Sequence, residues 1–251
     1  MATSVSDDGA GAARQRRAQR GLSKLLVRDV RKLRRLIIPS RLQATVPEWI
    51  LAVQALVGEY GNASATAAAD YYEAERVAAA VTGRFTVPLL DPPPDAQVDS
   101  GLRWATKDLW PRDPEDPKTT EVQKLPLEQR LDAAEKKAEA VAQKLVIDQG
   151  RGTVQGAVRQ DRMAVGYARA AALGACAFCR LIASRGMVFK QDTAGFRAHD
   201  GCNCAVVPVF RGQRFELSAH AAEWDRLYRE YAAPFPGDQL RRFRQAIAEH
   251  G

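Results

Sequence analysis

The sequence predicts a mainly α-helical protein with a small β component, an α+β chain in which helices dominate. Apolar residues recur every three or four positions over most of the chain, which is the period of a helix with one buried face. Stretches with strand character are short and lie beside a cluster of cysteines in the last third. Of the 251 residues, 46% are hydrophobic and 27% are charged, which is ordinary for a folded globular protein.

The N-terminal region is expected to begin with disorder and continue as a basic helix. Residues 1–13 are small, polar and partly acidic, a composition typical of disordered segments. A helix is expected from Arg14 to about Pro39, where proline ends it. Its apolar stripe consists of Leu22, Leu26, Val30, Leu33 and Ile37. Two further helices are expected between Pro47 and Thr82, separated at Gly61 and Asn62.

The middle of the chain reads as a linker followed by a long helix. Residues 88–117 hold seven of the thirteen prolines, which excludes a long helix and a central strand, so we expect one docked turn there. A long amphipathic helix is expected after Pro126 and is expected to end at Gly150 and Gly152. Its heptad-like stripe suits either packing within the chain or an oligomer seam. The stripe consists of Leu127, Leu131, Ala134, Ala138, Val141 and Leu145.

The last third combines a helix, two short strands and two terminal helices. A helix is expected from Thr153 towards Ala172. Residues 187–189 and 205–210 are expected to form a small β-hairpin, with Pro208 restricting the second strand to an edge. Residues 218–231 and 238–249 are expected to be helical, with His220 on the surface at a helix start.

These patterns divide the chain into four regions. They are a helical region with the basic N-terminal helix (1–87), a Pro-rich linker (88–120), a cysteine-bearing module (121–215) and C-terminal helices (216–251). No run of eighteen apolar residues is present, so we expect no membrane span.

The net charge of +7 is concentrated in one segment. Residues 14–41 contain eleven Lys or Arg and one acid, so this segment carries +10 and the remainder −3. The basic face is either simply solvated or contacts nucleic-acid phosphates or an acidic protein surface. No aromatic residue interrupts the basic run, so base stacking is not expected. The candidate contact residues are Arg14, Arg16, Arg17, Arg20, Lys24, Arg28, Arg31, Lys32, Arg34 and Arg35.

The cysteine cluster predicts a structural zinc site. The chain reads C-A-F-C at 176–179 and, nineteen residues later, H-D-G-C-N-C at 199–204, and these segments hold every cysteine. Thiolate and imidazole are the ligands that tetrahedral Zn²⁺ prefers. The candidate ligands are Cys176, Cys179, His199, Cys202 and Cys204. Cys176, Cys179 and His199 are the first choices, completed by Cys202 or Cys204.

Three other interpretations of the cluster remain. Disulfides require an oxidising compartment, and no secretory signal peptide is evident. Buried, inert cysteines would not be expected to gather in one place. Zinc deaminases use a Glu as proton shuttle, but no Glu lies between Cys176 and Cys204. Five candidates for four positions leave no open site, and neither nucleotide-binding glycine motif is present, so no enzymatic activity and no catalytic residue are expected.

The cysteine region resembles the minor head proteins of tailed bacteriophages similar to the F protein of phage Mu, in particular their actinobacteriophage branch. The resemblance covers residues 151–210 and rests on A-C-A-F-C-R-L-I-A-S-R-G-M-V-F and H-D-G-C-N-C-A-V-V-P-V-F. It implies a minor capsid protein made in the host cytoplasm and assembled into the virion, in the head interior or at the portal vertex. Portal, capsid and scaffold proteins would be its partners, with a role in head assembly or DNA ejection. The alternative is a zinc-containing protein that binds double-stranded DNA through the basic helix.

Overall fold

The computed structural model describes residues 3–189, 198 and 201–251 and confirms a mainly α-helical chain with a small β part. The helices are α1 (Ala10–Leu33), α2 (Leu42–Ala78), α3 (Asp95–Thr106), α4 (Leu127–Gln160), α5 (Ala177–Ser184), α6 (Ala219–Tyr231) and α7 (Gln239–His250). The strands are β1 (Thr3–Ser6), β2 (Ala164–Ala170), β3 (Met187–Phe189), β4 (Ala205–Phe210) and β5 (Gln213–Glu216). Short 3₁₀ turns lie at Arg34–Leu36, Pro39–Arg41 and Lys107–Leu109.

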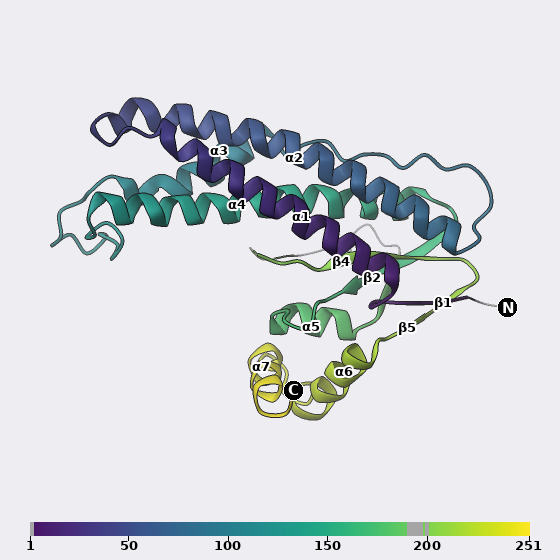
Figure 1. Ribbon diagram of the computed structural model, residues 1–251. Coiled ribbons are helices and arrows are strands. Elements are labelled where there is room, and N and C mark those ends of the chain that lie inside the picture. The colour runs from purple at the N-terminus through teal and green to yellow at the C-terminus, as the bar shows by residue number, and fades with distance from the viewer. Residues whose placement is uncertain (1–2, 190–197, 199–200) are drawn as a thin grey trace.

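Helices α1 to α4 form an elongated bundle that lies along one side of the molecule (Figure 1). Trp49, Val53, Leu102 and Ala138 are among the side chains fully buried between these helices. Despite the length of α2 and α4, no helix in the described part of the chain is both long and apolar enough to cross a membrane.

Two of the glycines expected to end helices, Gly61 and Gly150, instead lie where α2 and α4 touch. Each helix continues without a break through Gly61 or Gly150, so the sequence-based boundaries at Gly61–Asn62 and at Gly150 and Gly152 are wrong. A Cβ on Gly61 would collide with the side-chain oxygen of Gln149, and a Cβ on Gly150 would lie 2.5 Å from the hydroxyl of Ser64. These glycines therefore allow two helices to approach closely, a role that depends on the partner helix and not on local sequence.

The Pro-rich segment contributes a helix, not a single docked turn. Helix α3 begins directly after Pro94, a position where the fixed φ and missing N–H of proline are tolerated. Val98, Leu102 and Leu109 of this segment are buried in the bundle core. The prolines thus bound a packed element on both sides.

A three-stranded antiparallel sheet in the order β3-β2-β4 lies beneath the bundle. The expectation of a helix through residues 164–170 is wrong, and so is the direct hairpin of 187–189 with 205–210, because β2 lies between them. Strand β4 is an edge strand, as Pro208 predicted. Both faces of β2 are covered, since Tyr167 packs with α2 and α4 whereas Ala168 packs with Ala12 of α1. A strand buried on both faces lacks the alternation that identifies strands in sequence.

The first described residues are ordered, contrary to the expected disorder of residues 1–13. Strand β1 pairs in parallel with β5, and α1 already begins at Ala10. Asp7 lies between β1 and α1. Its buried carboxylate accepts hydrogen bonds from the backbone N–H of Ser218 at 2.7 Å and from the Ser218 hydroxyl at 2.8 Å. The partners lie 211 residues apart, so local composition could not reveal them.

The C-terminal helices confirm the prediction and enclose a separate core. Helices α5, α6 and α7 pack together around Leu181, Trp224, Leu227 and Phe243. His220 is exposed at the start of α6, as expected.

Candidate metal centre

Three cysteine thiols meet at the edge of the C-terminal core. Cys179 lies in the first turn of α5, and Cys202 and Cys204 lie in the segment that leads into β4. Their sulfur atoms all lie within 4.8 Å of one another, and the Cys179 and Cys202 sulfurs are 3.5 Å apart. All three side chains are buried, with exposed fractions of 1%, 5% and 2%.

The spacing of these sulfurs suits one tetrahedral metal ion. Zinc–sulfur bonds of about 2.3 Å in tetrahedral geometry place two sulfurs about 3.8 Å apart. The Cys179–Cys202 separation is close to this value. None of the four cysteines, all of which lie in the described part of the chain, forms a disulfide. The trio could therefore hold a metal ion.

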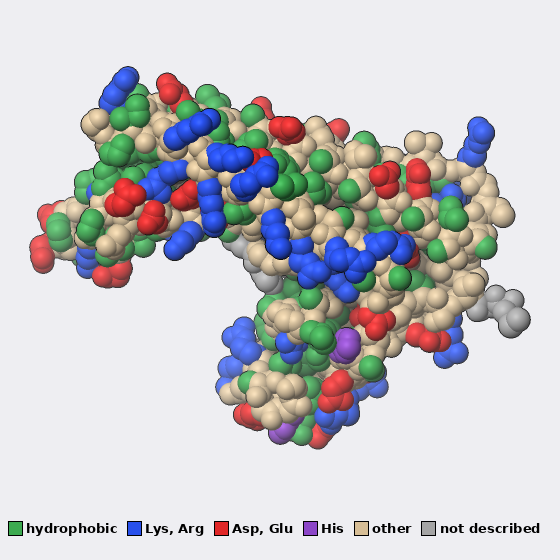
Figure 2. All heavy atoms as spheres, in the orientation of Figure 1, with side chains coloured by type: hydrophobic (Ala, Val, Ile, Leu, Met, Phe, Trp, Pro, Cys, Tyr) green, Lys and Arg blue, Asp and Glu red, His purple; other side chains and the backbone are tan. Residues whose placement is uncertain are grey.

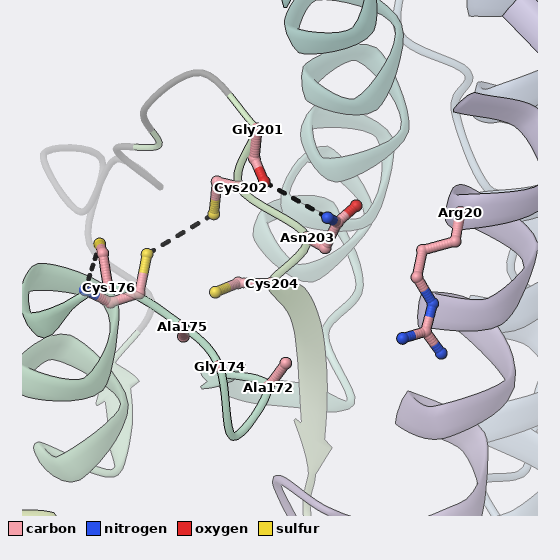
Figure 3. A pocket seen from close by; sticks show the side chains of 10 residues that line it. Arg20, Ala172, Gly174, Ala175, Cys176, Gly201, Cys202, Asn203 and Cys204 are labelled. Atoms are coloured by element: carbon pink, nitrogen blue, oxygen red, sulfur yellow. Dashed lines mark hydrogen bonds between the residues drawn. The ribbon is translucent and has the colours of Figure 1, made fainter. Parts of the chain in front are cut away.

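The other two predicted ligands are placed differently. Cys176 is exposed and caps α5, where its sulfur accepts a hydrogen bond from the backbone N–H of Cys179 at 3.5 Å. It also lines the cavity of about 320 Å³ onto which the three thiols open (Figure 3). His199 lies outside the described residues. The structure thus brings three of the five candidates together and places Cys176 beside them.

Two buried arginines surround the cluster with positive charge. Arg151 of α4 donates to the backbone carbonyls of both Cys202 and Cys204, and also to the Asp148 carboxylate at 2.8 Å. A guanidinium nitrogen of Arg169 lies 3.6 Å from the Cys179 sulfur. Buried cations favour the thiolate form that a metal requires.

Sequence reasoning did not identify the role of Arg151. One signal was present, because Arg151 precedes Val154 and Val158 by three and seven residues and so shares their apolar helix face. A charged residue on a buried face is expected to have a specific partner.

The thiols influence one another's ionisation. Hydrogen bonding from Cys179 lowers the pKa of Cys202 below its ordinary value, and the nearby Arg151 charge acts in the same direction. The same contact with Cys202 raises the pKa of Cys179. Cys202 is therefore the first thiol of the pair to ionise, and a bound metal would take the place of the shared protons.

The basic residues predicted as a contact surface divide into two groups. Towards the C-terminal end of α1, Arg31 pairs with Glu139, and Arg34 pairs with acids at the start of α4, including Glu128. Arg28 and Lys32 both pair with Asp29, and Arg16 donates to the Asp7 carbonyl at 3.4 Å. The residues that form no ion pair with an acid in the described ranges are Arg14, Arg16, Arg17, Arg20, Lys24 and Arg35.

Comparison with known proteins finds a match to the VG15 protein family over residues 7–232. No curated protein and no solved structure matches the chain. The family match indicates a phage protein, and it includes the bundle, the sheet, the cysteine cluster and α6. Because the match covers most of its length, this chain belongs to the VG15 protein family.

Proposed function

We propose that the protein is a structural minor capsid protein of a tailed phage, located at the portal vertex of the head and acting in head assembly or DNA ejection. It is made in the host cytoplasm and works through its interfaces, not as an enzyme. Membership of the VG15 family supports the phage origin. The likeness of the C-x-x-C and H-x-x-C-x-C segments to Mu F-like minor head proteins supports the position in the head.

The observation that carries this proposal is the burial of three thiols from two distant segments at one point. We propose that they bind a structural zinc ion, with Cys176 or His199 as the fourth ligand. Such an ion would join α5 to the segment before β4, across 23 residues of chain. Four protein ligands leave no open coordination position, which suits a structural role and not a catalytic one.

Metal analysis and portal binding test the two parts of this proposal. We expect about one zinc per purified chain, and we expect co-purification with the portal protein of the same phage when the two are co-expressed. The major capsid protein, co-expressed in the same way, serves as the comparison. Absence of the protein from purified virions would contradict the head assignment, and metal-free folded protein with reduced thiols would contradict the zinc assignment.

A second candidate is a zinc-containing DNA-binding protein that uses α1. One observation favours it, namely that Arg17, Arg20 and Lys24 form no ion pair with any acid the structure describes. Steeply salt-dependent DNA binding by the isolated protein would support this function. Binding to portal without measurable DNA binding would support the first.

A further inference from the structure

A groove of about 620 Å³ runs along α1, between this helix, α4 and the segment that carries Cys202 and Cys204. We call it the α1 groove. Arg20, Lys24, Arg28 and Arg31 line it from α1, and Asn203 lines it from the cysteine segment. Figure 2 shows Lys and Arg side chains gathered in a band along α1 on this face of the molecule.

The spacing of these cations gives the groove one continuous basic wall. They follow one another at intervals of four, four and three residues, so they share one face of the helix. At 1.5 Å per residue, the row is roughly 17 Å long. That length corresponds to about five base pairs of duplex DNA at 3.4 Å each.

The charge of the row is only partly neutralised. Arg28 pairs with Asp29, and Arg31 pairs with Glu139. Arg20 and Lys24 are exposed and form no ion pair with an acid within the described ranges. Among the described residues, no acid therefore compensates these two positive charges, which lie at the end of the groove nearer the cysteines.

The cysteine segment forms the opposite wall. Arg20, Gly201 and Asn203 line both the α1 groove and the cavity onto which the thiols open. Figure 3 shows Arg20 on its helix across the space from Asn203 and Cys204. Asn203 lies between Cys202 and Cys204 in sequence, and its side-chain amide donates to the Gly201 carbonyl at 3.3 Å. The position of this wall therefore depends on the cysteines that flank Asn203.

We propose that the α1 groove binds the phosphodiester backbone of double-stranded DNA, with Arg20 and Lys24 contacting phosphates and Asn203 forming the facing wall. This inference rests on the DNA-contacting function given above as the second candidate. It assigns the contact to one groove and to two cations that no described acid pairs with, not to the whole basic helix. Contacts to phosphates alone carry no sequence information, so binding is independent of DNA sequence.

The lining favours a duplex over a protein or a single strand. Among the described lining residues, the apolar side chains are Val27 and Ile147, and none is aromatic. Protein partners are usually held by aromatic or apolar anchors that fill a pocket, and single strands stack on aromatic rings. Phosphates need only cations and polar donors.

The central test compares two double variants with the same change in net charge. Arg20→Ala/Lys24→Ala removes the two groove cations that form no ion pair with a described acid. Arg84→Ala/Arg112→Ala removes two exposed cations that lie outside the groove and form no described ion pair. Binding of fluorescein-labelled 24-base-pair duplexes of two unrelated sequences is measured by anisotropy over a range of salt concentrations.

We expect the parent protein to bind both duplexes equally. The groove variant should lose at least about tenfold in affinity at 0.1 M salt, and its log–log salt slope should fall by about 2 because two phosphate contacts are lost. The control variant should stay within about twofold of the parent. Equal losses in the two variants, no loss in either, or equally tight binding of poly-glutamate would each overturn the proposal.

A third variant tests the facing wall. Asn203→Asp is nearly isosteric and adds a negative charge between the cysteines and Arg20. We expect severalfold weaker DNA binding with unchanged zinc content. Parent-like DNA binding by this variant would show that the cysteine segment is not part of the site. A parent protein that binds neither duplex would contradict the DNA-binding candidate itself, whereas parent-like binding by the groove variant would contradict only the assignment to this groove.

Discussion

Between the four helices of the bundle, seventeen buried apolar side chains make up the hydrophobic core of the described residues. In the C-terminal core, three of the eleven buried residues are cysteines that face one another. The bundle is stabilised by the apolar surface that it removes from water. The C-terminal core is smaller, and a metal ion bound by its three buried thiols would stabilise it further. The comparison teaches that one chain can combine a purely apolar core with a core that contains three buried thiols able to hold a metal ion.

Of the changes considered, removal of the metal should produce the largest difference in stability between the two cores. Chelation, or Cys179→Ser, should remove binding energy on the order of 10 kcal/mol from the C-terminal core. In hydrogen exchange, amides of α5 to α7 should lose protection, whereas those of α2 and α4 should keep theirs. If the metal-free protein melts at the same temperature as the parent, the thiols do not hold a structural metal ion.

Cys176→Ser sharpens this test. Serine is a good N-cap, so the start of α5 keeps its cap and any loss of metal reports ligation. We expect metal loss, with Cys176 as the fourth ligand. Retention of one zinc per chain would instead assign that position to His199.

A cavity made in the bundle should destabilise the bundle and leave the C-terminal core unchanged, and the loss of stability should be smaller than that caused by metal removal. Leu102 is fully buried among α1 to α4, so Leu102→Ala should lower the free energy of unfolding of the bundle by about 3 kcal/mol. Urea unfolding measures the loss, and zinc content should be unchanged. The control is Leu51→Ala, which truncates a side chain that is 64% exposed and should change stability by less than about 0.5 kcal/mol. Loss of zinc from the Leu102 variant would mean that the two cores are not independent.

The smallest expected effect is a pH-dependent change in the stability of the bundle, which depends on the charge of Asp108. Burial tends to raise the pKa of Asp108, but hydrogen bonds from Lys137 at 2.6 Å and from Thr120 outweigh it and leave the pKa below its ordinary value. A carboxylate with a lowered folded-state pKa stabilises the protein above its unfolded pKa, and this contribution is lost as pH falls through the folded pKa. Asp108→Asn should therefore be about 1 kcal/mol less stable than the parent at pH 7, since Lys137 is partly exposed.

The same difference should shrink as the pH falls below about 4, where the carboxylate of the unfolded chain begins to bind protons while the folded-state carboxylate is still charged. Urea unfolding of both proteins at several pH values measures it. A difference that stays constant down to pH 2 would assign the effect of Asp108 to packing and not to its charge.

Local pattern predicted the elements whose partners lie next to them in sequence. The periodic stripes predicted α6 and α7 nearly at their observed bounds and α1 with both ends shifted by four to six residues. The cysteine spacing predicted five candidate ligands, of which Cys179, Cys202 and Cys204 lie together. Prediction failed where the conformation of a residue or segment depends on a partner that is distant in sequence. Gly61 and Gly150 serve an opposing helix, β2 is covered on two faces, and β1 is paired with a strand near the other end of the chain. Arg151 belongs to the same class, since its carbonyl partners lie about fifty residues away.

The pairing of β1 with β5 also has a consequence for synthesis of the chain. The ribosome completes residues 213–216 long after residues 3–6, with 210 residues between paired positions. At about 5–20 residues per second, this interval is roughly 10 to 40 s. During translation the N-terminal strand therefore waits without its partner, and Asp7 cannot reach Ser218 until the last third has emerged. Closure of the fold by its first residues must be one of the last events in making this protein.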